Sequence, residues 1–253
     1  MKNLKGFLIL VMGLFLLNGC ATDEQAKQKA AIHLRLGYQS LQSGDSTSAL
    51  RELLQAANLN PKDPEIRFAL GWAYSAKGRY LEALEQYQQT LNLDPKFTEA
   101  HNAIGAIYLE MGKWDEAIQE FEKVLKDILY PTPFYVINNI GWAYFKKGER
   151  SRAIEYFKKA VSLKPDFGLA YYNMGLAFKE LKQLEEATTA FQNVLTHAPN
   201  FFDAHFQLGL LYFDAGKHEQ AAKHFEEVVR LAPLTENARL SKQYLELIKK
   251  VSK

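Results

Sequence analysis

Small and apolar residues recur along the chain at a nearly constant interval. A glycine that follows Leu, Ile or Met recurs at six positions with spacings of 34, 34, 36, 34 and 34 residues. These glycines are Gly37, Gly71, Gly105, Gly141, Gly175 and Gly209. An alanine follows each of them after twelve residues, and Leu, Tyr or Phe follows after sixteen. Because a period of about 20–50 residues is typical of stacked repeats, the pattern predicts an all-α solenoid.

Each repeat is expected to contain two closely crossing helices, A and B. The recurring Gly and Ala supply the small side chains that a close crossing requires, and the Tyr or Phe fills the neighbouring space. A second set of glycines, at which a left-handed residue would end helix A, consists of Gly44, Gly78, Gly112, Gly148 and Gly216. The fifth repeat has Lys182 and Gln183 in place of this glycine, which predicts a small local loss of stability.

Prolines mark the ends of the repeats, because a helix does not continue through them. The predicted repeats cover residues 31–63, 64–97, 98–131, 132–167, 168–201 and 202–234. Residues 235–253 are predicted to form a capping helix that begins after Thr235 and covers the end of the stack. Its expected apolar face consists of Leu240, Tyr244, Leu247 and Ile248.

The junction between the third and fourth repeats contains two additional residues. Leu129 stands where a proline is expected, and Pro131 and Pro133 follow it. Two prolines separated by Thr132 predict a stiff connection, with Leu129 and Tyr130 docked on the edges of the adjacent repeats. We expect this insertion to change the rise of the stack between the third and fourth repeats.

The start of the chain has the pattern of a secretory signal. Lys2 and Lys5 precede an apolar run that ends at Leu17, which is shorter than the roughly 20 residues of a membrane-spanning helix. Residues 1–19 are therefore predicted to be removed, and residues 20–30 to form a modified N-terminus and a short polar tether. The alternative is an uncleaved signal anchor that ends at Cys20. The thiol would then be free, because the chain has no second cysteine for a disulfide.

Composition argues against catalysis and against nucleic-acid binding. Without residues 1–19 the chain has 29 basic and 29 acidic side chains, so no net positive surface is indicated. No phosphate-binding loop, HExxH motif or cysteine nucleophile is present in the repeats, and neither an enzyme nor a metal or other cofactor is predicted. We expect His33, His101 and His205, which share one repeat position, to pack in or near the core rather than bind a metal. His218 and His224 are expected at the surface.

A binding surface is predicted on helix A. Residues three before, one after and four after each glycine form an i, i+4, i+7 stripe, which we name the helix A stripe, and the position two before the glycine adjoins it. Aromatic anchors and amide clamps at these positions suit a groove for a segment of another protein. The alternative is that these side chains only pack within their own repeats. The predicted groove residues are Tyr38, Phe68, Trp72, Asn102, Asn138, Asn139, Trp142, Phe145, Tyr172, Asn173 and Phe206.

Two resemblances extend this interpretation. The Gly and Ala pattern of residues 31–233 resembles the tetratricopeptide repeat, which implies a right-handed superhelical solenoid of six helix-turn-helix repeats with a capping helix. Leu17-Asn18-Gly19-Cys20 resembles the bacterial lipobox, which implies a covalent lipid on Cys20. Ala21 in place of aspartate implies, by analogy with Gram-negative lipoproteins, an anchor in the outer membrane with the fold facing the periplasm.

The insertion at residues 129–133, between the third and fourth of six repeats in a lipoprotein of this length, resembles the PilF/PilW family of type IV pilus biogenesis lipoproteins. That resemblance implies a pilotin, which binds an outer-membrane secretin and assists its localisation and assembly. A general tetratricopeptide adaptor lipoprotein that scaffolds periplasmic envelope enzymes would share the lipobox and the repeats, and it stays open as the second hypothesis. An enzyme is the third, and the repeats leave no length for a catalytic domain.

Overall fold

The computed structural model describes residues 24–251, and every regular element among them is an α-helix. The chain divides into two compact units, Met1–Met111 and Gly112–Lys253. The division falls inside the third repeat, in the turn between its two helices. The predicted all-α fold of repeated helix pairs with one final helix is confirmed for the described residues.

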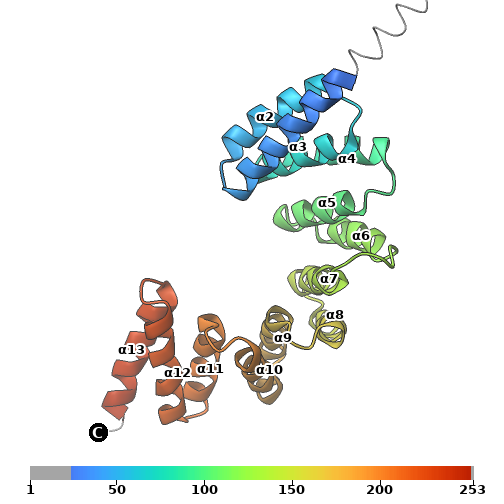
Figure 1. The fold of residues 1–253 in the computed structure, drawn as a ribbon. Helices are drawn as coiled ribbons and strands as arrows, with labels where there is room; N and C mark the ends of the chain where they lie inside the picture. The colour runs from blue at the N-terminus through green and yellow to red at the C-terminus, as the bar shows by residue number, and fades with distance from the viewer. Residues whose placement is uncertain (1–23, 252–253) are drawn as a thin grey trace, which may run out of the picture. The chain divides into compact units, whose positions relative to one another are not determined.

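The described part of the first unit contains five helices (Figure 1). Residues 24–42 form the first of them, and α2 (Ser46–Leu59), α3 (Pro64–Ala76), α4 (Tyr80–Leu93) and α5 (Thr98–Glu110) follow. Asp45 and Asp63 begin α2 and α3, because their carboxylates accept hydrogen bonds from the amides of Ser48 and Glu65 at 3.0 and 2.9 Å. Each of the helices α2 to α5 packs on the next, and α3 also touches α5.

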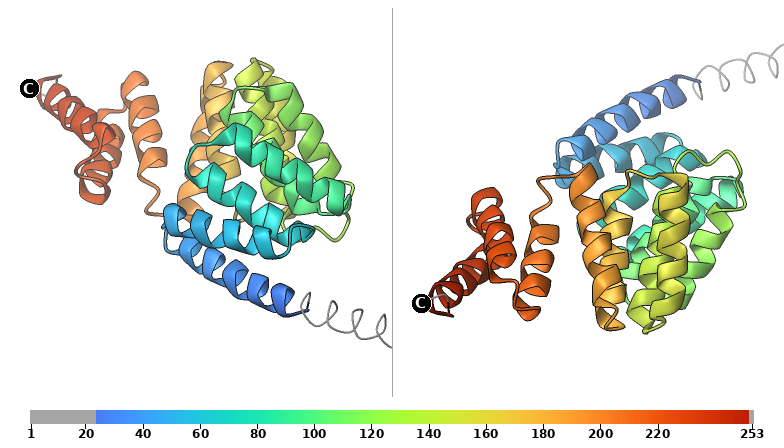
Figure 2. Two further views of the ribbon diagram at one scale, coloured as in Figure 1. Left: turned by 90° about the horizontal axis from the view of Figure 1, so that it is seen from above. Right: turned by 90° about the horizontal axis from the view of Figure 1, so that it is seen from below.

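The second unit contains eight helices, each of which packs on the next. They are α6 (Trp114–Val124), α7 (Pro133–Lys147), α8 (Arg150–Leu163), α9 (Gly168–Glu180), α10 (Leu184–His197), α11 (Phe202–Asp214), α12 (His218–Leu231) and α13 (Glu236–Val251). Figure 2 shows α7 to α10 lying side by side, in yellow-green to orange. The A helices α7 and α9 also touch one another, so part of each A helix faces its counterpart in the next repeat.

The recurring glycine places helix A against helix B. A Cβ atom added to Gly71, Gly141, Gly175 or Gly209 would lie 2.5–2.7 Å from a ring carbon of the residue sixteen positions later. Real Cβ atoms do not approach so closely, so only glycine fits. The partner rings are fully or almost fully buried, as are all six alanines twelve positions after the glycines. This confirms the predicted reason for the Gly and Ala pattern.

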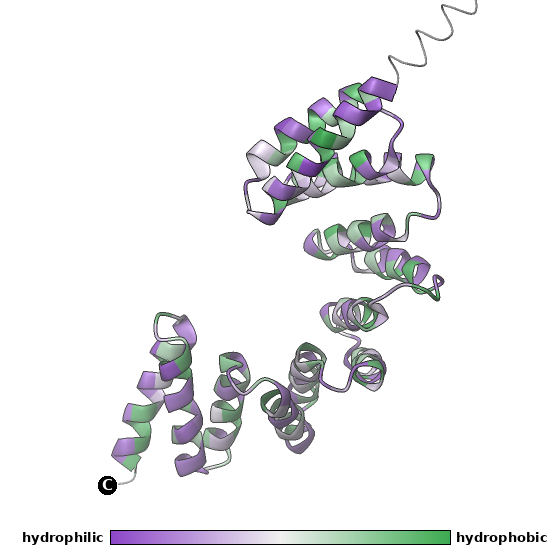
Figure 3. Cartoon of the chain, viewed as in Figure 1, coloured by the Kyte–Doolittle hydropathy of each residue, from purple (hydrophilic) through white to green (hydrophobic). Residues whose placement is uncertain are grey.

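Hydrophobic and hydrophilic positions alternate around the helices (Figure 3), so that each helix turns apolar residues towards its neighbours. The two ends of the described chain have clusters of buried side chains, from Ala30 to Ala73 in the first unit and from Phe206 to Ile248 in the second. Among residues 24–251, no helix combines the length and the apolar character that crossing a bilayer requires.

The turns between helices A and B confirm the second glycine set. Gly44, Gly78, Gly112, Gly148 and Gly216 have φ between +70° and +89°. Lys182 takes the same left-handed conformation with φ of +61°, and it is the only non-glycine residue with positive φ among the described residues. The Cβ of an L-residue is crowded in this conformation, so the fifth turn carries the strain that the sequence predicted.

The predicted tether is partly wrong. Residues 24–30 continue the first helix, and Ala30 is buried against α2 and α3. Small and polar residues such as Ala, Gln and Lys are good helix formers, so the absence of an apolar period did not prevent a helix. The predicted signal peptide (residues 1–19), Cys20 and the first three residues after it lie outside the described residues, so the structure does not test these predictions.

The insertion before α7 is ordered, but Leu129 does not dock as predicted. Ile128 and Leu129 are 93% and 84% exposed, whereas Tyr130 is half-buried. The carboxylate of Asp127 accepts a hydrogen bond from the Leu129 amide at 3.0 Å, and the Asp127 carbonyl accepts one from the Tyr130 amide at 3.2 Å. This local turn fixes the backbone and directs the two aliphatic side chains to solvent.

The final helix begins as predicted. The Thr235 hydroxyl accepts a hydrogen bond from the Ala238 amide at 3.2 Å. Ile248 is buried, Leu240 and Tyr244 are half-buried against α11 and α12, and the Tyr244 ring stacks on Phe225 with centroids 4.9 Å apart. Leu247 is 47% exposed, and Leu245 packs in the cluster in its place.

The glycine contact gives a direct test of the packing. We expect Gly175→Ala to lower the free energy of unfolding by about 2–3 kcal/mol, because the added methyl would overlap the Phe191 ring. The control is Gly168→Ala at the start of α9, where an added Cβ would make ordinary contacts at 3.7 and 3.9 Å. Equal guanidinium unfolding midpoints for the two variants, measured by circular dichroism, would contradict the close crossing.

The strained turn gives a second test. Lys182→Gly is expected to raise the free energy of unfolding by about 1 kcal/mol, because glycine adopts positive φ without steric cost. The reciprocal change is Gly216→Lys in the sixth repeat, where φ is also positive and no atom would contact the added Cβ. It should lower the free energy of unfolding by a similar amount. A loss of stability in Lys182→Gly would show that this turn is not strained.

Candidate protein-binding surface

The helix A stripe of the first unit presents one exposed aromatic residue. Trp72 is 42% exposed, and its ring lies 6.2 Å from that of the half-buried Tyr38. Burial, together with the nearby carboxylate of Glu65, raises the pKa of Tyr38 above its usual range, so the phenol stays neutral. Phe68 instead packs between Tyr87 and Phe97, with centroids at 5.4 and 5.0 Å. Trp72 and Tyr38 are therefore the accessible anchors of this unit.

In the second unit the stripe is centred on a pair of stacked rings. Trp142 lies flat on Phe145 with centroids 5.1 Å apart and an interplanar angle of 16°. The Lys146 ammonium lies 5.0 Å from the Trp142 ring, and the Arg150 guanidinium lies 4.6 Å from the Phe145 ring, which is a cation–π arrangement on both rings. Trp142 is half-buried and Phe145 is 9% exposed, so Trp142 is the more accessible of the two.

Two of the predicted anchors contribute to the core instead. Phe206 is 8% exposed and packs edge-on against Phe225. Tyr172 is half-buried between Phe191 and Phe201, with centroids at 5.6 and 5.2 Å. Burial, and secondarily the nearby carboxylate of Asp203, raises the pKa of Tyr172, which keeps this phenol neutral as well.

The predicted amide clamp is largely internal. Asn138 and Asn173 are 2% and 6% exposed, and the Asn173 amide donates a hydrogen bond of 3.0 Å to the Asn138 carbonyl oxygen. This bond between two buried amides joins α7 to α9. Asn102 and Asn139 are half-buried and remain partly accessible. The prediction that all four amides face a partner is therefore wrong for Asn138 and Asn173.

An open cavity of about 400 Å³ lies beside the stacked rings. Phe145, Leu176, Lys179 and Gln207 come from the stripe and its neighbouring position on α7, α9 and α11, and Glu180 and Lys182 complete the lining. The Lys179 ammonium donates a hydrogen bond of 2.8 Å to the Gln207 side-chain oxygen. Of these six residues only Phe145 was among the predicted groove residues. Leu176 and Lys179 nevertheless belong to the helix A stripe, and Gln207 occupies the neighbouring position two before the glycine.

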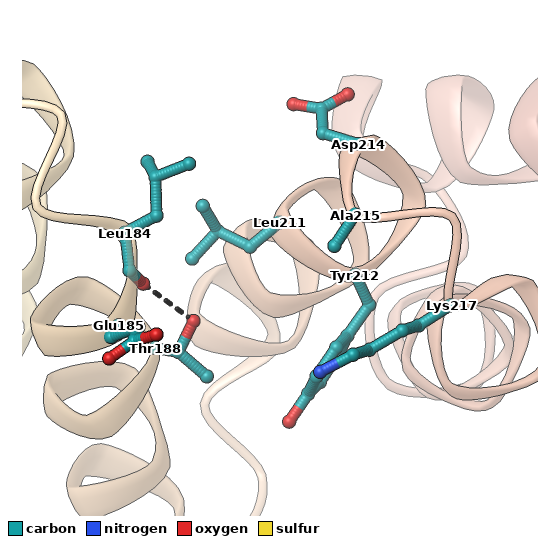
Figure 4. A pocket seen from close by; sticks show the side chains of 8 residues that line it. All are labelled: Leu184, Glu185, Thr188, Leu211, Tyr212, Asp214, Ala215 and Lys217. Atoms are coloured by element: carbon teal, nitrogen blue, oxygen red, sulfur yellow. Dashed lines mark hydrogen bonds between the residues drawn. The ribbon is translucent and has the colours of Figure 1, made fainter.

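A second cavity, of about 480 Å³, lies away from the stripe between α10 and α11. Figure 4 shows Leu184, Glu185 and Thr188 on one side of it and Leu211, Tyr212 and Lys217 on the other. The Thr188 hydroxyl donates to the Leu184 carbonyl at 2.8 Å and is satisfied within its own helix. The lining of this second cavity combines apolar side chains with the acidic Glu185 and Asp214 and the basic Lys217, and it shows no nucleophile beside a base.

The histidines differ from the prediction at two positions, because His218, expected at the surface, is half-buried with its ring 5.3 Å from that of Phe213, and His224 is also covered. His33 pairs with Glu52 at 2.8 Å, His101 is half-buried and His205 is buried, as expected for packing residues. His224 is not a surface residue, because its Nδ1 lies 2.9 Å from Nδ1 of His205. His205 Nε2 donates to the Pro199 carbonyl at 3.0 Å, so its Nδ1 accepts a hydrogen bond from the Nδ1–H of His224. Residues nineteen apart in sequence meet here because α11 and α12 cross.

No metal site is formed by the described residues, because no three His, Cys, Asp or Glu side chains converge in residues 24–251. The pair of His205 and His224 lacks a third ligand, and the Tyr212 ring stacks on His224 at 5.5 Å.

The repeats match models of a known family. Models described as TPR repeat or tetratricopeptide repeat match residues 52–85, 71–112, 98–127, 134–167 and 172–234. A search of curated proteins gave no match.

Several solved structures share the fold. A structure of PilF from Pseudomonas aeruginosa is 20% identical with a TM-score of 0.73, and the match covers 87% of this chain and 99% of that one. A structure of PilW, described as a widely conserved type IV pilus biogenesis factor, is 21% identical with a TM-score of 0.76 and coverages of 83% and 97%. YrrB, described as a TPR protein with an unusual peptide-binding site, is 22% identical with a TM-score of 0.55 and coverages of 76% and 97%.

The histidine pair predicts that stability depends on pH. Burial, and secondarily the proximity of His205, lowers the pKa of His224 to about 4 from an ordinary value of 6.5. A pKa that is lower in the folded state gives stability above pH 6.5 that is lost as the pH falls towards 4. We expect the loss attributable to this residue to be roughly 2–3 kcal/mol.

The measurement is the free energy of unfolding between pH 7.5 and 4 for the wild type and for His224→Leu. Carboxylates titrate in both proteins, so the difference between the two curves isolates the imidazole. Glu227 next to it is held ionised by Arg230, whose hydrogen bond lowers the pKa of this carboxyl. Parallel curves would show that His224 is not buried in its neutral form.

Proposed function

Because the chain is a tetratricopeptide repeat protein, we propose that it is a protein-binding scaffold of the pilotin type, anchored by a lipid on Cys20 in the outer membrane and facing the periplasm. In this role it binds a secretin and assists its localisation and assembly in type IV pilus biogenesis. The observation that supports the proposal is the match to PilF and PilW over 99% and 97% of their chains, which leaves almost no part of those folds without a counterpart.

The accessible part of the helix A stripe supports a role in protein binding. Trp72 and Trp142 expose large apolar rings on the first and second units, and tryptophan is frequent among the residues that dominate binding energy. Side chains beside them are already held in place: Tyr38 lies against Trp72, and Phe145 stacks on Trp142. Binding a partner would therefore order few further side chains, which lowers the entropic cost of association.

The absence of a reaction centre in the described residues agrees with a scaffold. The two cavities that we describe are open, and neither brings a nucleophile together with a base. Lys147, Glu149 and Lys223 have pKa values that are shifted chiefly by their hydrogen-bonded partners in surface ion pairs. These observations support binding rather than chemistry.

The second hypothesis, a general adaptor for periplasmic envelope enzymes, rests on the wide occurrence of this fold, which YrrB illustrates. A pilotin and an adaptor differ in the number of their partners, so identification of the bound proteins distinguishes them.

We expect a secretin to be the dominant partner when the full-length protein is used to capture proteins from detergent-solubilised envelopes. Trp72→Ala and Trp142→Ala should each reduce the captured secretin by about tenfold, because removal of a central aromatic anchor costs about 1–2 kcal/mol or more. Trp114→Ala is the control, since Trp114 opens α6 and lies off the stripe. Mass spectrometry identifies the bound proteins, and circular dichroism checks the helix content of each variant.

Peptidoglycan enzymes or a mixed set in place of the secretin would favour the adaptor. Capture of a secretin by both variants at the wild-type level would exclude the stripe as its binding surface.

A further inference from the structure

Lys179 is the one stripe residue with a charge, and it lines the cavity beside Phe145. Its ammonium donates to the Gln207 side-chain oxygen at 2.8 Å, and this amide is neutral. Within residues 24–251, no carboxylate forms an ion pair with it. The negative charge of Asp214 favours the charged form of Lys179 without a hydrogen bond to it, and the positive charge of Lys182 disfavours that form.

Partial burial makes this arrangement unfavourable for a cation. Removal from water is the main effect on Lys179, and it lowers the pKa of the amine. Other basic groups of the same unit have acidic partners: Lys147 bonds to Asp115 at 2.6 Å and to Glu149 at 3.0 Å, and Arg150 bonds to Glu180. A half-buried ammonium without a counter-ion gains most from an anion that a ligand supplies.

The rest of the cavity defines what else the ligand carries. Phe145 and Leu176 give it an apolar wall, and Trp142 extends this wall by stacking on Phe145. Lys182 is an exposed residue of the lining, and the carboxylate of Glu180 is paired with Arg150. The lining therefore has two lysines and one carboxylate that already has a partner, so the site favours a ligand with both acidic and apolar groups.

We propose that this cavity binds an acidic segment of a partner protein, with one Asp or Glu carboxylate on the Lys179 ammonium and a neighbouring apolar side chain against Phe145 and Leu176. The Gln207 amide, which lies within hydrogen-bond distance of the same ammonium, is placed to bond to the backbone of that segment. This inference rests on the proposed function, because it specifies the chemistry of the partner segment on the same surface.

The test uses random peptides and needs no secretin. A phage-displayed library of 12-residue peptides is selected on the full-length protein in detergent, immobilised through a C-terminal biotin. The expected consensus contains an Asp or Glu at a fixed spacing from a Leu, Ile, Phe or Trp. Fluorescein-labelled copies of the leading peptide, and of the same peptide with its acid changed to the amide, are then titrated by fluorescence anisotropy.

Three variants test whether the carboxylate of the peptide binds to the Lys179 ammonium. Lys179→Met should weaken binding of the acidic peptide by about tenfold or more, because it removes a charge-assisted hydrogen bond, and should bind the acidic and amide peptides equally. Lys179→Arg should keep the preference for the acid. The control is Lys158→Met, which removes an equal charge from an exposed position on α8 and should change the affinity less than twofold.

A structural readout separates loss of binding from loss of folding. Lys179→Met removes a cation that burial disfavours, so its thermal midpoint should equal or exceed that of the wild type. The proposal is overturned if no peptide is enriched, if the consensus lacks an acid, or if Lys179→Met retains the wild-type preference for the acidic peptide. The peptide selection contains no secretin, so its result does not depend on which protein the envelope capture identifies. Failure of this proposal can therefore be told apart from failure of the proposed function.

Discussion

The close contact between a glycine of helix A and a large side chain of helix B determines the geometry of each repeat. At Gly71, Gly141, Gly175 and Gly209 the ring from helix B occupies the space that a Cβ would take. The contact fixes which side of helix A is buried, and through the helical rotation of about 100° per residue it fixes where every other side chain of that helix points. Without this contact the stripe would have no defined orientation.

The same rotation explains which stripe residues are accessible. Residues three before and four after the glycine lie about 60° and 40° from the buried direction, whereas the residue one after it lies about 100° away. Asn138, Phe145 and Phe206, which are buried, all belong to the first two positions, and the exposed Trp72 belongs to the third. A prediction from the i, i+4, i+7 pattern alone assumes that the three positions are equally exposed. The predicted groove therefore includes core residues.

The fold could be predicted from the sequence almost completely, because the contacts that define it join residues at constant separations. The helix pairs, the left-handed turns and the Thr235 cap all depend on such local spacing. The Asn138–Asn173 bond and the His205–His224 pair could not be predicted, because they depend on which rotamers meet across adjacent helices. The exposure of Leu129 depends on a single turn formed by Asp127. The helical residues 24–30 lacked an apolar pattern because Ala30 alone makes the buried contact.

The central claim is that the repeats act on a secretin at the outer membrane, and secretin assembly in cells tests it most directly. The measurement is the amount of detergent-resistant secretin multimer in outer-membrane fractions of cells that lack this protein, with the wild type or Cys20→Ala restored. The account predicts that multimers are lost without the protein, return with the wild type, and do not return to the outer membrane with Cys20→Ala. Multimers at the normal level in cells without the protein would contradict it.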